Sequence, residues 1–160
     1  MDLSDHEYAR VHVPDIESAP NPTREKKEVD EAVGASAFGF NVYTADPGER
    51  LPWGYHRHPD HEELFYVLAG ELRVDTANGT QHLHAEDAFF VPENAPVSAE
   101  AVGETAARVV AVGAPKDADD AIIEEECPAC GEVTGRTHEV EGDEYVLFCE
   151  ACGAEVTRFD

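Results

Sequence analysis

The sequence predicts an all-β protein in which a β-barrel is followed by a small metal-stabilised unit. The middle of the chain consists of short apolar runs separated by turn residues, a pattern typical of antiparallel strands in sandwiches and barrels. The sequence lacks long stretches of helical periodicity. Near the C-terminus, two Cys-x-x-Cys-Gly motifs lie in a segment that is too short to build its own core.

These patterns divide the chain into four segments. Residues 1–36 are predicted to form an N-terminal extension, in which weak alternation at 8–13 would fit an edge strand. Residues 37–113 are predicted to form the barrel, residues 114–124 a linker, and residues 125–160 the C-terminal unit. The linker contains proline, lysine, aspartate and a run of glutamates, which favour irregular structure.

Several strand candidates lie within the barrel segment. Asn78-Gly79 stands between two of them and predicts a hairpin, because both residue types tolerate positive φ angles. The candidates are residues 38–44, 63–68, 71–76, 81–84, 88–91 and 106–112.

Acidic residues dominate the charge of the chain, with 35 Asp and Glu against 11 Lys and Arg and a formal net charge of −24. Such a charge repels nucleic acids and anionic membranes, so neither is an expected partner. Because the acids are spread along the chain, they are typical of a halophilic archaeon rather than of an acidic interaction tail. The sequence shows no secretion signal and no apolar run of bilayer length, so we expect a cytoplasmic location with reduced or metal-bound cysteines.

Two histidines and a glutamate form the motif with the clearest chemical meaning. His56 and His58 are two residues apart, so on an extended chain both imidazoles point to the same face. Glu63 follows at the start of the next strand candidate, from which its carboxylate can return to that face. Neutral imidazole and carboxylate are ligands for zinc, iron, manganese, nickel and copper. We therefore expect a divalent metal site with open positions.

The same region resembles the first sequence motif of the small single-domain cupins. That motif carries two His, a Glu and a later Gly, which fall here on His56, His58, Glu63 and Gly70. Its leading glycine has no counterpart, because Arg50 stands at that position. The resemblance implies a cupin-type β-barrel, or double-stranded β-helix, with a pocket for a metal or a ligand inside.

A later stretch is similar to the second cupin motif but lacks its metal ligand. Asp87 and Pro92 match the motif, whereas Glu86 and Asn94 replace glycines. Val97 stands where the family has a metal-binding histidine, and valine offers no donor atom. The resemblance therefore implies a site with three of the usual four ligands.

Three interpretations of this incomplete site remain open. In the first, the three remaining ligands bind a metal that has a wider open face. In the second, another histidine replaces the missing ligand, and the candidates are His61, His82 and His84. In the third, no metal binds and the motif lines a polar pocket.

The four cysteines, Cys127, Cys130, Cys149 and Cys152, form two knuckles that resemble a zinc ribbon over residues 125–160. Each Cys-x-x-Cys turn brings two thiolates to one ion, and the glycine that follows lets the backbone fold back. Four thiolates close a tetrahedral shell, so we expect a structural zinc site without an open position. The alternatives are a redox pair and an iron site of the rubredoxin type.

These features predict a metal-binding protein of the cupin fold that holds a small molecule in its barrel. The alternative is a metal-dependent enzyme, namely a dioxygenase, isomerase or lyase, for which the sequence identifies no separate acid or base. A nucleic-acid-binding regulator is disfavoured, because residues 124–160 carry eleven acids and two arginines. The cupin resemblance implies a homodimer, and the ribbon could dock a protein partner.

Overall fold

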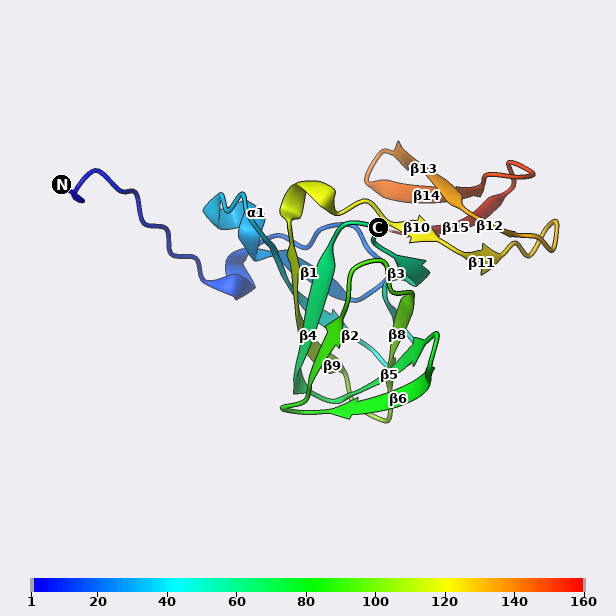
Figure 1. Cartoon of the computed structure of the whole chain (residues 1–160), viewed down its shortest axis with the longest axis horizontal. Coiled ribbons are helices and arrows are strands. Elements are labelled where there is room, and N and C mark those ends of the chain that lie inside the picture. The colour runs from blue at the N-terminus through cyan, green and yellow to red at the C-terminus, as the bar shows by residue number, and fades with distance from the viewer. Residues whose placement is uncertain (1, 160) are drawn as a thin grey trace.

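The computed structural model describes residues 2–159, except for the side chains of Pro52 and Trp53. Two five-stranded antiparallel sheets form a barrel, and a smaller group of strands follows it towards the C-terminus (Figure 1). The first sheet has the strand order β1-β2-β9-β4-β7, and the second has the order β10-β3-β8-β5-β6. Neighbours in each order are hydrogen-bonded but mostly distant in sequence, so long-range pairing holds the barrel together.

The strand bounds are as follows. The first sheet contains β1 (Glu25–Glu28), β2 (Gly39–Ala45), β9 (Ala107–Ala114), β4 (Glu62–Ala69) and β7 (Ala88–Val91). The second contains β10 (Ile122–Ile123), β3 (Arg50–Arg57), β8 (Val97–Val102), β5 (Glu71–Thr76) and β6 (Gly79–His84). Helical structure is limited to α1 (Val29–Val33) and to the 3₁₀ turns Val13–Asp15 and Lys116–Ala118 within the described residues.

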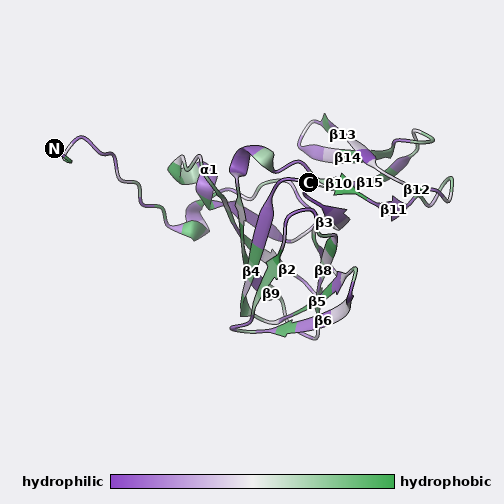
Figure 2. Cartoon of the chain, viewed as in Figure 1, coloured by the Kyte–Doolittle hydropathy of each residue, from purple (hydrophilic) through white to green (hydrophobic). Residues whose placement is uncertain are grey.

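Apolar side chains from both sheets meet in one hydrophobic core. β4 buries Phe65 and Val67, and β5 buries Leu72 and Val74, while the residues between them point outward or are less buried. This alternation follows from the two-residue period of a strand, and the barrel strands accordingly change between hydrophobic and hydrophilic along their length (Figure 2). The predicted all-β barrel is confirmed.

Each strand candidate from the sequence falls on a strand, but β3 and β8 were not predicted as strands. Pro52 and Gly54 interrupt the β3 pattern, and β8 mixes polar residues with alanine. The predicted hairpin joins β5 to β6, with Thr76 paired to Gly79. Gly79 has a positive φ of 115°, whereas Asn78 does not, so the glycine alone uses this freedom.

The edge strand that would fit residues 8–13 is not formed. Residues 6–12 have no regular secondary structure, Tyr8 is 91% exposed, and this segment extends away from the barrel (Figure 1). The edge strand of the extension is instead β1, whose charged residues pair with β2 from Glu25 opposite Thr44 to Glu28 opposite Asn41. Tertiary pairing therefore outweighed the weak local alternation.

The predicted linker also adds to the barrel. Within residues 114–124, Ile122 and Ile123 form β10 and pair with Arg57 and His56 of β3. This pairing brings the end of the linker against the strand that carries the histidine motif. A run of two strand residues is too short to recognise by periodicity.

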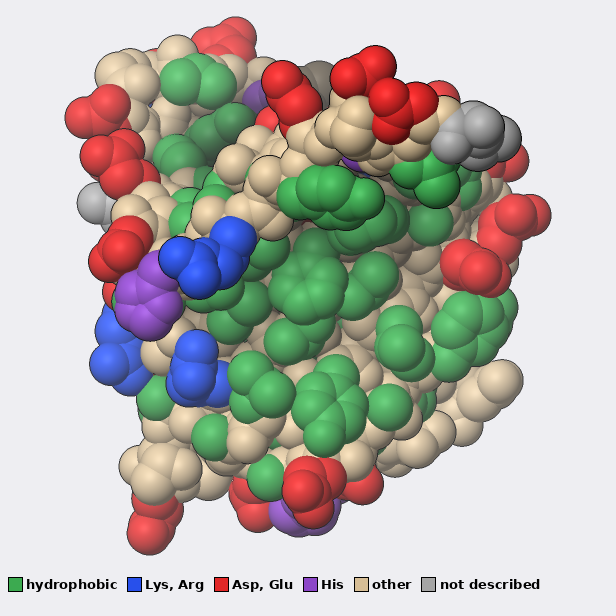
Figure 3. All heavy atoms as spheres, turned by 90° about the vertical axis from the view of Figure 1, so that its left-hand side faces the viewer, with side chains coloured by type: hydrophobic (Ala, Val, Ile, Leu, Met, Phe, Trp, Pro, Cys, Tyr) green, Lys and Arg blue, Asp and Glu red, His purple; other side chains and the backbone are tan. Residues whose placement is uncertain are grey.

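The outer face of the first sheet is unusually apolar (Figure 3). Leu64 lies between Phe90 and Val112 in the strand register, and Tyr66 lies opposite Val110. The large side chains of this face are well exposed, with Phe90 at 53% and Leu64 at 42%. Exposed apolar patches of this kind mark interaction surfaces more often than isolated apolar residues do.

The C-terminal unit consists of two small sheets. β11 (Glu125–Glu126) pairs with β12 (Val133–Thr134), and β13 (Arg136–Glu141), β14 (Glu144–Cys149) and β15 (Glu155–Phe159) form a three-stranded sheet. Among the residues that the structure describes, no helix is long and apolar enough to cross a membrane.

A buried carboxylate ties α1 to the segment after β9. The Asp30 residue is only 4% exposed, and its carboxylate lies 2.8 Å from Lys116 Nζ and accepts a hydrogen bond from the Phe40 amide at 3.0 Å. Burial opposes the ionisation of Asp30, but Lys116 and the Phe40 amide outweigh it and lower the pKa of this carboxyl group. Asp30 is therefore ionised at neutral pH, and it holds α1 against β2 and against the segment that follows β9.

We predict that Asp30→Asn lowers the free energy of unfolding at neutral pH by about 1–3 kcal/mol, because a buried charge-assisted contact is lost. Since the native pKa of Asp30 is depressed, its contribution is present at neutral pH and disappears as the pH falls through that native pKa. Urea unfolding of both proteins, at neutral pH and in acid, measures the difference.

Glu31→Gln is the matched control, because Glu31 lies equally close to Lys116, at 2.8 Å, but its side chain is 63% exposed. An exposed ion pair contributes less than about 1 kcal/mol. Equal losses in the two variants would contradict the role given to Asp30.

Candidate metal centres and cavity

A cavity of about 440 Å³ lies within the barrel and reaches the C-terminal unit. Its walls come from strands of both barrel sheets, from the segment between β9 and β10, and from β13 and β14. Leu51, Phe65 and Val109 are typical of the apolar barrel wall. Polar and charged side chains share the lining, so the cavity is of mixed polarity. They include His58, Glu63, Lys26, Lys116 and Arg136.

The structure brings His56, His58 and Glu63 together, as the two-residue spacing predicts. Their potential ligand atoms all lie within 4.8 Å of one another. His56 lies on β3, His58 follows the end of that strand, and Glu63 lies on β4 in the opposite sheet. The two imidazole centroids are 5.0 Å apart at an interplanar angle of 84°. The set therefore spans the interior of the barrel from one sheet to the other.

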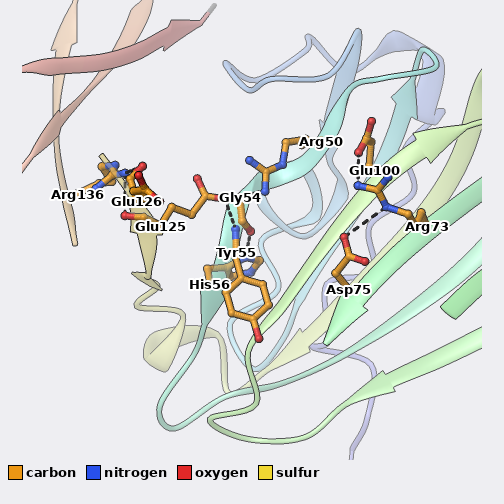
Figure 4. A network of polar contacts seen from close by, with 10 residues as sticks. All are labelled: Arg50, Gly54, Tyr55, His56, Arg73, Asp75, Glu100, Glu125, Glu126 and Arg136. Atoms are coloured by element: carbon orange, nitrogen blue, oxygen red, sulfur yellow. Dashed lines mark hydrogen bonds and ion pairs between the residues drawn. The ribbon is translucent and has the colours of Figure 1, made fainter. Parts of the chain in front are cut away.

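His56 is held in one orientation by its own strand. Its Nδ1 lies 2.8 Å from the carbonyl oxygen of Gly54 (Figure 4), which fixes Nδ1 as the protonated nitrogen because a carbonyl only accepts. Burial lowers the pKa of His56, so the imidazole is neutral. Nε2 is left as a free acceptor that is buried without a hydrogen-bond partner among the described residues.

His58 and Glu63 form a close pair. His58 Nε2 lies 3.1 Å from Glu63 Oε1, at an angle outside that of a hydrogen bond, and His58 Nδ1 lies 3.3 Å from the carbonyl oxygen of Asp120. Burial lowers the pKa of His58, but the Glu63 carboxylate outweighs this and raises it overall. Burial raises the pKa of Glu63, but the imidazoles of His58, His56 and His61 outweigh burial and lower the pKa of this carboxyl group overall. A divalent cation between them would replace this electrostatic attraction.

His61 and Asp119 form a second group that shares Glu63. Their donor atoms also lie within 4.8 Å of one another, with His61 Nε2 3.7 Å from Glu63 Oε1 and 3.6 Å from Asp119 Oδ1. The His61 residue is only 3% exposed, and its Nδ1 donates to the carbonyl oxygen of Pro115 at 2.8 Å. Asp119 was missed by the sequence analysis, because it lies in the linker and only the β10 pairing brings it here.

The other two histidines weighed as replacement ligands lie elsewhere. His82 and His84 are on β6, which is an edge strand of the second sheet, and both are exposed. His84 Nε2 lies 3.3 Å from Glu71 on the neighbouring strand. Of the three candidates, only His61 is near Glu63.

Val97 occupies the side of the site where the cupin motif has its last ligand. It is 1% exposed and lies directly opposite His56 in the β3–β8 register. Glu86 and Asn94, which stand where the motif has glycines, have positive φ angles of 74° and 62°. The turns at Glu86 and Asn94 thus have the backbone conformation that glycine favours, whereas the side chain at the ligand position, Val97, is apolar.

Two further polar atoms face the cavity. The Tyr43 hydroxyl is buried, and burial followed by the Glu63 carboxylate raises the pKa of this group, so it stays a neutral phenol. Asn41 Oδ1 is buried without a hydrogen-bond partner among the described residues. A buried, unpaired acceptor costs desolvation free energy unless a ligand or water donates to it.

The donor set fits a divalent metal. The neutral His56 imidazole aims an unpaired buried nitrogen at a site that also holds a second imidazole and an ionised carboxylate. Two imidazoles and one carboxylate occur in non-haem iron and catalytic zinc sites, where water or substrate fills the open positions.

The four cysteines form a separate cluster. Cys127 Sγ lies 3.8 Å from Cys152 Sγ, and Cys130 Sγ lies 3.9 Å from Cys149 Sγ. Thiolates at about 2.3 Å from a tetrahedral ion are about 3.8 Å apart, whereas a disulfide requires about 2.05 Å. The Thr134 hydroxyl lies 3.1 Å from Cys149 Sγ, and this contact is the largest of the causes that lower the pKa of the Cys149 thiol to about 6. The thiolate is the form that binds a metal.

The two knuckles have the same backbone geometry. The Gly131 amide donates to the Cys127 carbonyl oxygen at 2.8 Å, and the Gly153 amide donates to that of Cys149 at 2.9 Å. Both glycines have positive φ angles, 76° and 74°, which explains why glycine follows each motif.

Comparison with known proteins finds a sequence similarity within the barrel. Residues 41–113 match the Cupin domain model. The chain is 35% identical over 78 residues to Polyketide synthase CurC from Streptomyces cyaneus, a match that covers 49% of each protein. The chain therefore spans about half the length of this curated relative.

Solved structures agree on the fold. A sugar phosphate isomerase from a cupin superfamily, from Silicibacter pomeroyi, superimposes with a TM-score of 0.62 over 92% of this chain and 91% of its own, at 17% identity. The polyketide cyclase RemF from Streptomyces resistomycificus gives 0.59 over 69% and 81%, at 19% identity. The barrel thus has the cupin-type fold that the sequence motifs predicted, and at these identities the structural likeness concerns the fold alone.

We predict that Gly113→Ala displaces His61. A Cβ on Gly113 would lie 2.1 Å from His61 Nε2, and a buried ring has little room to move. The expected loss in the free energy of unfolding is about 1–3 kcal/mol, which is typical of overpacking. Chemical denaturation of the variant measures it.

A double-mutant cycle identifies the clashing partner. In a His61→Ala background the added methyl has space, so Gly113→Ala should then cost less than about 0.5 kcal/mol. The same cost in both backgrounds would show that His61 does not occupy the position described.

Proposed function

We propose that the protein is a metal-binding cupin that holds a small molecule in its barrel cavity. His56, His58 and Glu63 would hold one divalent ion, which is iron, manganese, nickel, zinc or copper. The observation that carries this proposal is the buried Nε2 of His56, which is neutral, unpaired and close to two further donors. An empty polar pocket would leave this atom without the partner that its burial calls for.

The cavity indicates the kind of small molecule. Its lining mixes apolar with polar side chains, and the neutral Tyr43 hydroxyl and the unpaired Asn41 Oδ1 offer one donor and one acceptor. A molecule with both apolar surface and a hydroxyl group would match this lining, because Asn41 would accept a hydrogen bond from that hydroxyl. The volume of about 440 Å³ lies within the range of small-molecule sites.

A metal-dependent enzyme, acting as a dioxygenase, isomerase or lyase, is the second candidate. A bound metal with open positions supplies Lewis acidity or dioxygen activation. Asp119 favours this candidate, because its carboxylate lies at the rim of the cavity, 3.4 Å from His58 Nδ1, where it could move a proton on a bound molecule. The partial match to Polyketide synthase CurC is a further reason to test small-molecule chemistry.

The four cysteines would hold a structural zinc ion in a zinc ribbon. Their sulfur spacings and the paired knuckles support a tetrahedral thiolate site. Such a site would contribute most of the stability of the C-terminal unit, on the order of 10 kcal/mol by comparison with zinc-finger peptides. Metal-bound thiolates are also consistent with a cytoplasmic location, and the acidic composition with a halophilic archaeon.

We predict two metal ions per chain in protein purified without chelator, measured by plasma mass spectrometry. Replacing His56 and His58 together with alanine should remove one ion, because two of the three barrel ligands are lost. Replacing Cys127 and Cys149 with serine should remove the other. His82→Ala with His84→Ala is the matched control, since these exposed histidines lie on β6 and should leave both ions bound.

The outcome separates the interpretations of the barrel. A single ion that survives the loss of His56 and His58, and that disappears with the cysteines, would refute the barrel metal and the enzyme candidate with it. Loss of the barrel ion on His61→Ala, with retention on His58→Ala, would instead assign the metal to the group around Asp119.

A homodimer is proposed through the apolar outer face of the first sheet. Leu64, Tyr66 and Phe90 are exposed and adjacent on that face, as described above. A sheet face packed on a second copy would remove this apolar area from water. A protein partner docked on the ribbon remains a separate candidate, whereas the acidic surface disfavours nucleic acid.

We predict that Leu64→Lys with Phe90→Lys converts the dimer to a monomer, because each copy would bring two unpaired charges into the interface. Light scattering coupled to size-exclusion chromatography gives the mass directly. Val133→Lys with Val140→Lys is the control, since these residues are comparably exposed, at 68% and 59%, but belong to the C-terminal unit. A monomeric parent protein would contradict the proposal.

A further inference from the structure

One wall of the cavity is not part of the barrel. β13 and β14 of the C-terminal unit line the same space as His58 and Glu63. His138 lies opposite Leu147 in their register, and the two-residue period puts the wall residues on one face of the sheet. These wall residues are Arg136, His138, Tyr145 and Leu147.

The wall is partly aromatic. The Tyr145 ring stacks on His138 with centroids 5.8 Å apart, and on Phe159 of β15 with centroids 6.0 Å apart and an interplanar angle of 6°. The stack therefore joins all three strands of this sheet. On the opposite face of the sheet, Val146 is fully buried.

Glu125 joins this wall to the barrel (Figure 4). Its Oε1 accepts hydrogen bonds from Arg50 Nη2 at 2.6 Å and from the Tyr55 amide at 2.8 Å, both on β3. Its carbonyl oxygen accepts a hydrogen bond from Arg136 Nη2 on β13 at 3.1 Å. One residue thus connects the strand that carries His56 to the strand that forms the wall.

Gly54 makes this connection sterically feasible. A Cβ at Gly54 would lie 2.6 Å from Glu125 Oε1, and its φ of 154° also suits glycine. The carbonyl oxygen of the same residue orients His56. Gly54 therefore has two roles. Its lack of a side chain leaves room for Glu125, and its carbonyl oxygen orients His56.

We propose that the β13–β14 face is the outer wall of the ligand site and that Glu125 holds it closed over the histidines. The four-cysteine unit then determines access to the cavity. The identity of the ligand rests on the function proposed above, but the closure is independent of any metal in the barrel.

His61 is the reporter, because it is 3% exposed in the closed arrangement, lines the cavity and is not one of the three proposed barrel ligands. Diethylpyrocarbonate modifies accessible histidines, and mass spectrometry of the digested full-length protein follows each site. His82 and His84 are exposed and serve as internal standards.

Glu125→Ala should speed the modification of His61 by about tenfold or more, because charge-assisted hydrogen bonds that favour the closed state are lost. Cys127→Ser with Cys149→Ser should produce the same gain by disordering the wall. The rates at the exposed His82 and His84 should stay unchanged, which shows that the reagent dose is the same, and an unchanged circular dichroism spectrum shows that the barrel remains folded.

Glu100→Ala is the matched control. Glu100 accepts a hydrogen bond from Arg73 at 2.8 Å within the second sheet, and its side chain is 28% exposed against 25% for Glu125 (Figure 4). It should leave the His61 rate unchanged. A His61 rate that is the same in Glu125→Ala, in the cysteine variant and in Glu100→Ala would overturn the closure. If the barrel binds no metal, the proposed function is refuted, but the modification rates of His61 still test the closure.

Discussion

The two-sided pairing of β3 is the constraint on which the rest of the structure depends. On one side β8 pairs with it and places Val97 opposite His56, and on the other side β10 pairs with it through Ile123. A strand with neighbours on both edges satisfies its backbone groups within the sheet, so its side chains can be buried at the barrel interior. His56 is buried for this reason, and Glu125 reaches the same strand because β10 has already brought the chain there.

The loss of the donor atom at Val97 makes the site one-sided. The remaining donors come from β3, β4 and the segment before β10, whereas the β8 side presents an apolar surface. A ligand that approaches the proposed metal would therefore meet hydrocarbon on one side and polar groups on the other. Glu86 and Asn94 have positive φ angles, so these two turns have the shape that glycine usually provides although neither residue is a glycine.

The sequence predicted what depends on local spacing. The period of a strand was enough to bring His56 and His58 to one face, and the knuckle spacing was enough to cluster the four cysteines. Features that depend on pairing between distant segments were missed. β1 is made of charged residues, so nothing in its pattern indicates a strand, and Asp119 reaches the site only through β10. The wall formed by β13 and β14 likewise depends on the contacts of Glu125.

The short path from Ile123 to Cys127 has a consequence for how this protein can be divided. The segment that matches the cupin family ends at residue 113, yet β10, Asp119 and the outer wall all lie beyond it. A recombinant barrel truncated at the family boundary would have an unpaired edge on β3 and an open pocket. The structural unit is therefore larger than the segment that matches the family, and replacement of the four-cysteine unit would also replace one side of the cavity.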